Sequence, residues 1–159
     1  MTPHEVTHLP YRPCAGVVLT NHAGQVFAGQ RAEMTTAAWQ MPQGGVDEGE
    51  TPEEAAFREL KEETGVKRKH VTLLGHTADW IPYDFPTEVA GKRWGGKFRG
   101  QKQMWYHLRL DAPDDVIDLA YKDVEFSDWR WMDPAELLEV IVEFKRPVYR
   151  QVMEELGLI

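Results

Sequence analysis

The segment from Gly44 to Val66, GGVDEGETPEEAAFRELKEETGV, constrains this chain more than any other feature. It begins with two glycines and continues into a stretch that is rich in carboxylates. Read from Gly44, its spacing is G-x(5)-E-x(7)-R-E-U-x-E-E-x-G-U, where U is a bulky aliphatic residue. The residues at the fixed positions are Gly44, Glu50, Arg58, Glu59, Leu60, Glu62, Glu63, Gly65 and Val66. The segment therefore predicts a glycine-rich loop followed by one short, charged helix.

Capping residues mark both ends of this expected helix. Thr51 is a good N-cap, Pro52 suits the first helical position, and Glu54 lies three residues after Thr51 as in a capping box. Gly65 can adopt the left-handed conformation that ends a helix. Ala56 and Leu60, four residues apart, are expected to face a core, and Ala55 and Phe57 flank this apolar stripe.

Three glutamates of the helix fall on one face. Glu59, Glu62 and Glu63 are spaced i, i+3 and i+4, so their carboxylates converge. Like charges repel unless a positive group lies among them, and a hard divalent cation such as Mg²⁺ or Mn²⁺ suits oxygen ligands. The alternative is an ordinary solvated face, since charged residues are mostly exposed. Arg58 lies four residues before Glu62 and is expected to orient a carboxylate rather than to bind substrate.

The complete spacing resembles the signature of the Nudix hydrolases, without a gap or a substitution, and this favours the metal site over the solvated face. The resemblance implies an α/β/α sandwich, that is, a mixed sheet flanked by helices. It implies Mg²⁺ as cofactor, with Mn²⁺ able to substitute, and the carbonyl of Gly44 as a further ligand. It also places Glu125 beside the helix as a metal ligand or base; the alternative for Glu125 is an exposed loop carboxylate. Glu62 and Glu125 both remain candidates for the general base.

Composition restricts the class of protein. The 159 residues are expected to form a single domain, 1–159, with residues 1–10 as a flexible N-terminal segment. Cys14 is the only cysteine, so no internal disulfide can form, and we expect a buried thiol and a reducing compartment. The sequence contains neither a signal-peptide pattern nor a membrane-spanning stretch, which predicts a cytoplasmic protein.

Charge is distributed unevenly along the chain. The net charge of −8 argues against binding to duplex DNA, whose phosphates would be repelled. From Glu88 to Arg109, however, six basic residues stand against one acidic residue, a net charge of +5. This local excess suits a polyphosphate or the end of an RNA. The glycines at positions 90–96 predict a flexible loop there.

The remaining elements were assigned from apolar periodicity and turn residues. A hairpin is expected from Ala15–Thr20 and Val26–Gln30 around residues 21–24. Further strands are expected at Val71–Trp80, Gln103–Leu110 and Trp129–Met132, with a loop from Pro82 to Gly100. Helices are expected to begin near Pro134 and Arg146. The order of strands and helices predicts a mixed sheet flanked by helices.

Residues outside the motif narrow the resemblance to the bacterial RNA pyrophosphohydrolases and the related dinucleoside polyphosphate hydrolases. The segments that carry it, in order, are Tyr11-Arg12-Pro13, Trp39-Gln40-Met41-Pro42-Gln43-Gly44-Gly45, Gly100-Gln101-Lys102-Gln103, Glu125-Phe126, Trp129-Arg130-Trp131, Phe144-Lys145-Arg146 and Val148-Tyr149. The resemblance covers Tyr11 to about Leu156. The chain departs from the pattern around Glu88–Phe98.

Several of these residues are candidate substrate ligands. Arg12, Arg31 and Lys145 supply positive charge for phosphate oxygens. Phe144 is expected to stack on a base, with core packing as the alternative. Gln101 can read a base or phosphate edge. Tyr83 lies where dinucleoside polyphosphate hydrolases often carry a tyrosine.

The sequence thus predicts a Mg²⁺-dependent enzyme that hydrolyses pyrophosphate linkages. The expected substrate is the 5′-triphosphate end of RNA, which is left as a 5′-monophosphate. A dinucleoside polyphosphate is the alternative substrate, since it also joins a nucleoside to a phosphate chain. A nucleotide sensor without turnover is the third possibility, but it would not require the complete set of glutamates.

Overall fold

A mixed sheet forms the centre of the computed structural model, which describes residues 8–33, 38–85, 96–122 and 124–159. The main path of the sheet runs in the order β3 (Trp39–Gln40), β2 (Val26–Arg31), β1 (Tyr11–Thr20), β7 (Gly100–Leu110) and β5 (Val71–His76). Three strands lie off this path: β4 (Gln43–Gly45) pairs with β1, β6 (Ile81–Asp84) with β7, and β8 (Phe126–Met132) with β2. The long strands β1 and β7 are parallel, from Tyr11 opposite Gly100 to Thr20 opposite Arg109.

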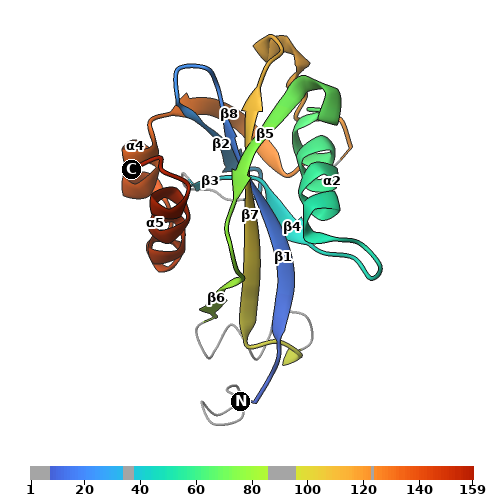
Figure 1. Cartoon of the computed structure of the whole chain (residues 1–159), viewed down its shortest axis with the longest axis vertical. Coiled ribbons are helices and arrows are strands. Elements are labelled where there is room, and N and C mark those ends of the chain that lie inside the picture. Colours follow the sequence, from blue (N-terminus) through green and yellow to red (C-terminus); the bar gives the residue numbers. More distant parts are fainter. Residues whose placement is uncertain (1–7, 34–37, 86–95, 123) are drawn as a thin grey trace.

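Helices cover both faces of this sheet (Figure 1). Helix α2 (Pro52–Thr64) lies on one face, whereas α4 (Pro134–Val140) and α5 (Arg146–Glu155) lie on the other. Strand β1 is buried on both sides: Val17 packs in the core under α2 and Val18 in the core under α4 and α5. This two-sided burial confirms the predicted α/β/α sandwich.

Helix α2 begins and ends where the sequence predicts. The hydroxyl of Thr51 accepts a hydrogen bond from the Glu54 backbone N–H, and the Glu54 carboxylate accepts one from the Thr51 N–H, which completes the capping box. Gly65 is left-handed with φ 74° and donates its N–H to the Lys61 carbonyl. The predicted apolar positions Ala55, Ala56 and Leu60 are fully buried against the sheet. Local sequence rules therefore fix the helix that carries the glutamates.

Two of the expected boundaries are wrong. The predicted strand Val71–Trp80 ends at His76, after a register shift between Leu73 and Gly75 in its pairing with β7. The expected loop from Pro82 contains the strand β6, whose Pro82 lies opposite Lys102. Proline is tolerated there because β6 pairs only with β7 and is an edge strand. Of the predicted flexible segments, residues 1–10 and the loop around 88–98, residues 1–7 and 88–95 lie outside the described residues.

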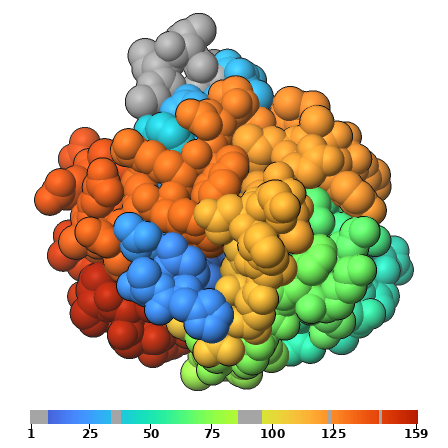
Figure 2. All heavy atoms as spheres, turned by 90° about the horizontal axis from the view of Figure 1, so that it is seen from above, coloured from blue at the N-terminus to red at the C-terminus, as the bar shows by residue number. Residues whose placement is uncertain are grey.

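The predicted turn between β1 and β2 is tight. The side-chain oxygen of Asn21 accepts the backbone N–H groups of Ala23 and Gln25, and Gly24 has φ 82°. Figure 2 shows this turn, in blue, between the orange residues that precede and form α4 and the yellow residues at the end of β7. Across this surface the ring of His22 lies 3.0 Å from the Asp111 carboxylate. Within the described part of the chain, no helix is long and apolar enough to cross a membrane.

Candidate active site

The guanidinium of Arg58 holds the acidic residues of the motif together. Its Nε donates to Glu50 and its Nη2 to the Gly45 carbonyl, each at 2.8 Å. Its Nη1 donates to Glu59 at 2.8 Å and to Glu62 at 3.3 Å. The hydrogen bonds from Arg58 lower the pKa of Glu50 and raise that of Arg58. Arg58 therefore joins the glycine loop to the helix, the position expected of a residue that orients carboxylates.

Gly44 brings the backbone of β4 close to one of these carboxylates. It pairs with Ala15 of β1, and a Cβ atom added to it would lie 2.2 Å from the carboxyl carbon of Glu59. Any side chain at this position would displace that carboxylate. The glycine is therefore required by the close approach between Glu59 and the loop.

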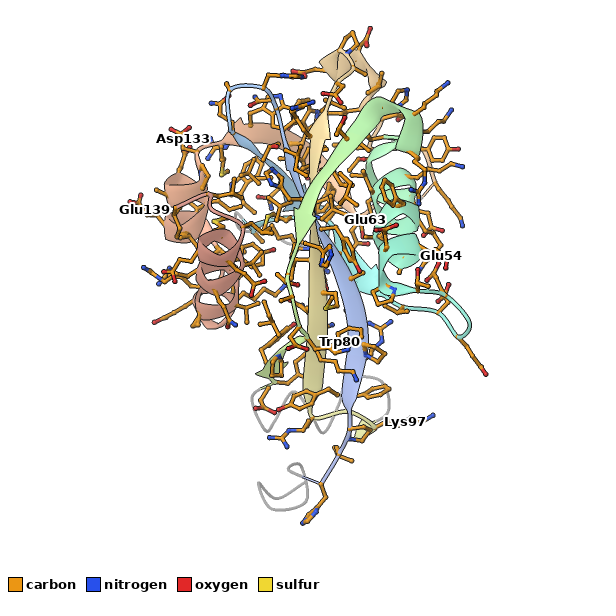
Figure 3. All side chains as sticks on the ribbon, viewed as in Figure 1. Glu54, Glu63, Trp80, Lys97, Asp133 and Glu139 are labelled. Carbon is orange, nitrogen blue, oxygen red and sulfur yellow. The ribbon has the colours of Figure 1, made fainter. Side chains whose placement is uncertain are left out.

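Glu59 and Glu63 form a pair of carboxyl groups, of which Glu63 is buried and Glu59 partly buried. Glu63 is only 4 % exposed and points from α2 toward the sheet (Figure 3). Burial raises the pKa of both groups, that of Glu63 to well above its ordinary value, and the negative charge of Glu59 adds to the shift at Glu63. The Oε2 atom of Glu63 is buried without a hydrogen-bond partner among the described atoms. A buried oxygen of this kind is costly unless a cation or a donor faces it.

Glu125 reaches the same region from the segment before β8. It directly precedes β8, and its carbonyl accepts the N–H of Ala32 at the register shift that ends the β2–β8 pairing. Its charge acts on Glu63, and its carboxylate lies 3.7 Å from Nη2 of Arg31. Its side chain is 38 % exposed, against 16 % for Glu62. Glu125 is therefore the more accessible of the two candidate bases.

The acidic side chains have the chemistry of a divalent metal site, but in this structure Arg58 offsets part of their negative charge. Within the described residues, no three His, Cys, Asp or Glu side chains are gathered into a group that could hold a metal ion. Nη1 of Arg58 binds both Glu59 and Glu62, and Lys122 binds Glu62 at 3.0 Å. Oxygen-only ligands, two of them buried or partly buried and mutually repelling, and the unpartnered oxygen of Glu63 fit a hard cation such as Mg²⁺.

Two of the predicted substrate ligands meet at one glutamine. Arg31 donates from Nη1 to the Gln40 side-chain oxygen at 3.4 Å, and Lys145 donates to the same atom at 3.1 Å. Gln40 itself is 5 % exposed. Arg31 also forms an ion pair with Glu33. The two cations are thus brought together on the side of the sheet where Glu125 lies.

The other predicted substrate ligands lie around β1 and β7. Gln101 is buried, and its side-chain oxygen accepts hydrogen bonds from Tyr83 at 3.2 Å and from Gln103 at 2.8 Å. Arg12 lies against Gly45 and donates to the sulfur of Cys14. Cys14 is buried, and burial raises the pKa of its thiol to about 11, as expected of an inert cysteine. The side chain of Phe144 lies outside the described atoms, so its stacking role stays a prediction.

Some residues of the site were not assigned a role from the sequence. Glu50 binds Arg58 with both carboxylate oxygens, at 2.8 and 3.0 Å, and Gln40 collects Arg31 and Lys145. Gln103 links Gln101 to the ring nitrogen of Trp105. The signal that could have found Glu50 is its fixed place in the motif. For the glutamines it is their recurrence at positions 40, 43, 101 and 103.

A sandwich with clustered glutamates on one helix beside a glycine-containing strand is the arrangement that the resemblance to the Nudix hydrolases implies. The chain belongs to the Nudix family: the family model described as NUDIX domain matches residues 10–156. The chain is 51 % identical over 154 residues to the RNA pyrophosphohydrolase of Roseobacter denitrificans. The aligned region covers 97 % of this chain and 96 % of that protein. It is 49 % identical over 155 residues to the RNA pyrophosphohydrolase of Rhodospirillum rubrum, with 98 % and 92 % covered.

Solved structures share the fold. The Escherichia coli dihydroneopterin triphosphate pyrophosphohydrolase superposes with a TM-score of 0.71 at 23 % identity, covering 91 % of this chain and 99 % of that one. A binary complex of the Ap4A hydrolase of Caenorhabditis elegans superposes with a TM-score of 0.62 at 22 % identity, covering 87 % and 93 %. At these sequence identities the similarity shows a shared fold and does not show a shared substrate.

Proposed function

We propose that this protein removes the β- and γ-phosphates from the 5′-triphosphate end of RNA and leaves a 5′-monophosphate, with Mg²⁺ as cofactor. The observation that carries the proposal is the match, over nearly the full length of both chains, to proteins named RNA pyrophosphohydrolase. The Glu59–Glu63 pair beside Gly44 supports the same chemistry. The lone, buried thiol of Cys14 supports a reducing compartment, the cytoplasm, as the place of this activity.

The residues that would hold the metal are Glu59, Glu62, Glu63 and Glu125 with the carbonyl of Gly44. When bound, Mg²⁺ supplies charge neutralisation at the phosphoryl oxygens and activates water as the nucleophile. Arg58 donates to Oε1 of Glu59 and to Oε2 of Glu62, so each carboxylate has a second oxygen through which it could bind the metal. The bonds from Arg58 to Glu50 and to the Gly45 carbonyl join the helix to the loop.

The chain's own cations would bind the phosphate groups of the substrate. Arg31 and Lys145, together at Gln40, can exchange the shared amide oxygen for phosphate oxygens. Arg12, whose guanidinium lies against Gly45, would add a further positive charge for the phosphate groups. Glu62 or Glu125 would accept the proton of the attacking water, and their exchange for glutamine, one at a time, distinguishes them.

The experiment that tests this function compares two substrates at equal salt. Phosphate release from triphosphorylated RNA and from diadenosine tetraphosphate is measured with Mg²⁺, with Mn²⁺ and with a chelator. The proposal requires metal-dependent turnover with a higher kcat/KM on the RNA. A higher kcat/KM on the dinucleotide would assign the alternative substrate, and binding without turnover of either would make the protein a sensor.

A further inference from the structure

A basic groove runs along the flank of α2 that faces away from the sheet. It encloses about 440 Å³ and continues from α2 into the turn η1 (Arg68–His70). Its lining residues are Phe57, Arg58, Lys61, Lys67, Arg68 and Lys69. Five of these six carry positive charge, in a chain whose net charge is −8. Such a local excess of one sign attracts anions.

Four of these cations have no acidic partner among the described residues. Lys61, Lys67, Arg68 and Lys69 form no ion pair with any carboxylate in the described part of the chain, whereas Arg58 binds Glu50, Glu59 and Glu62. Neighbouring like charges repel one another, and a bound polyanion would relieve that repulsion. The groove is therefore suited to several negative charges in a row.

Aromatic rings lie among these cations. The ammonium groups of Lys61 and Lys67 each lie 6.0 Å from the ring centre of Tyr121, which is 43 % exposed. The guanidinium of Arg68 lies 3.7 Å from the ring centre of Phe57. Cations that follow a backbone beside rings on which bases can stack are the combination that binds single-stranded nucleic acid. Tyr121 lies beside the groove, against two of its lysines, where a base of such a chain could stack.

The groove shares one residue, Arg58, with the candidate active site. Arg58 lines the groove and also binds the glutamates Glu59 and Glu62. Lys122, next to Tyr121 in the chain, lies 3.0 Å from Glu62 on the same side. A chain whose end is held at the glutamates can therefore continue along α2 into the groove.

We infer that the basic groove binds the RNA backbone downstream of the 5′ end, so that substrate affinity grows with RNA length. This inference rests on the proposed function, because it takes RNA as the substrate. A dinucleoside polyphosphate has no chain to place in the groove. The groove thus gives the protein a means to prefer RNA over small nucleotides.

The test exchanges two cations of the groove and compares RNA lengths. In Arg68→Gln/Lys69→Gln, kcat/KM on a triphosphorylated oligomer of about twelve nucleotides should fall about 10-fold at low salt, through KM. Its salt dependence should become shallower by a slope of about 1.4, since each single-strand phosphate contact contributes about 0.7. A triphosphorylated trinucleotide should be hydrolysed as by the parent. The control Arg130→Gln/Arg150→Gln removes the same charge on the side of α4 and α5 and should change neither substrate.

A second variant separates stacking from charge. Tyr121→Ala should weaken hydrolysis of the longer RNA and leave the salt slope unchanged. Equal kinetics of the Arg68/Lys69 variant and the parent on the longer RNA would overturn the inference, as would an equal loss on the trinucleotide.

If the parent hydrolyses neither RNA, the proposed function fails, and the groove is then judged by fluorescence anisotropy with single-stranded RNA that ends in a 5′-hydroxyl. Weaker binding of this RNA by the variant than by the parent supports the groove; equal binding, or preferential binding of phosphatidylserine vesicles, overturns it.

Discussion

Two clusters of buried and partly buried polar side chains lie near β1, and they are satisfied in opposite ways. The glutamine cluster, Gln43, Gln101 and Gln103, consists of amides that can both donate and accept hydrogen bonds. Gln103, for example, donates to Gln101 at 2.8 Å and accepts from the ring nitrogen of Trp105 at 2.9 Å. The carboxylate cluster on α2 consists of groups that, when ionised, only accept, and Glu63 keeps an oxygen without a partner in the described chain.

The difference separates a structural role from a catalytic one. A buried network that provides its own donors and acceptors stabilises the fold without a ligand. A buried set of acceptors with the same sign of charge destabilises the fold until a cation is added, and Arg58 compensates only part of it. We therefore expect substitutions in the carboxylate cluster to act mainly on turnover and substitutions in the glutamine cluster mainly on stability.

The largest effect is expected from Glu63→Gln. The amide keeps the shape of the side chain but removes a metal ligand, so Mg²⁺-dependent turnover should fall about 10²-fold or more. Thermal stability should be unchanged or higher, because a repelling charge is removed. Activity assays and melting curves of the variant measure both, with Glu139→Gln on α4 as the control for an exposed charge. Glu62→Gln should behave similarly, and near-normal activity in both would refute the site.

The next effect concerns Arg58, which spans both roles. In Arg58→Ala the carboxylates lose their common donor, so activity should fall and unfolding should become easier by about 1–3 kcal/mol. Arg58→Lys should recover only part of the loss, because an ammonium lacks the forked geometry. Denaturant unfolding and Mg²⁺ titration are the measurements. Weaker substrate binding with unchanged stability and metal affinity would mean that Arg58 contacts substrate instead.

The sequence was sufficient where local rules decide the structure. The N-cap Thr51, the C-cap Gly65 and the spacing of Arg58 from Glu62 lie within one helix, and one turn of helix relates them directly. The mixed sheet flanked by helices was predicted from the order of strands and helices, and the resemblance to the Nudix hydrolases implied the α/β/α sandwich. The resemblance to the Nudix hydrolases added Glu125, whose distance along the chain gives no clue to its place.

Long-range pairing decided what the sequence did not predict. Gln40 accepts a hydrogen bond from Arg31 because β3 pairs with β2. Lys145, 105 residues further along the chain, donates to the same oxygen. Strand β6 was missed because Pro82 argues against a strand unless that strand lies at an edge. Edge position is a property of the assembled sheet, so no local pattern around Pro82 contains it.

A smaller effect on turnover, but a clear one on stability, is expected in the glutamine cluster. Gln103→Met keeps the approximate volume and removes both hydrogen-bonding groups, which leaves the ring nitrogen of Trp105 without its acceptor. Unfolding should become easier by about 1–3 kcal/mol, the range for a buried group left unsatisfied. Turnover per folded molecule should stay close to that of the parent. A loss of activity as large as that of Glu63→Gln would remove the distinction between the two clusters.

The smallest effect is expected from His107, which lies outside both clusters and reports on burial alone. Its ring nitrogen lies 2.9 Å from the Thr20 hydroxyl, and burial lowers its pKa below the ordinary 6.5. The folded state therefore favours the neutral ring. Above pH 6.5 the ring is neutral in both states and its contribution is constant; as the pH falls below 6.5, the unfolded chain takes up the proton first and stability declines.

In His107→Gln, which keeps a partner for Thr20 but does not titrate, melting temperatures between pH 7 and pH 5 should fall less steeply than in the parent. Parallel curves for parent and variant would show that the acid sensitivity of the fold arises elsewhere.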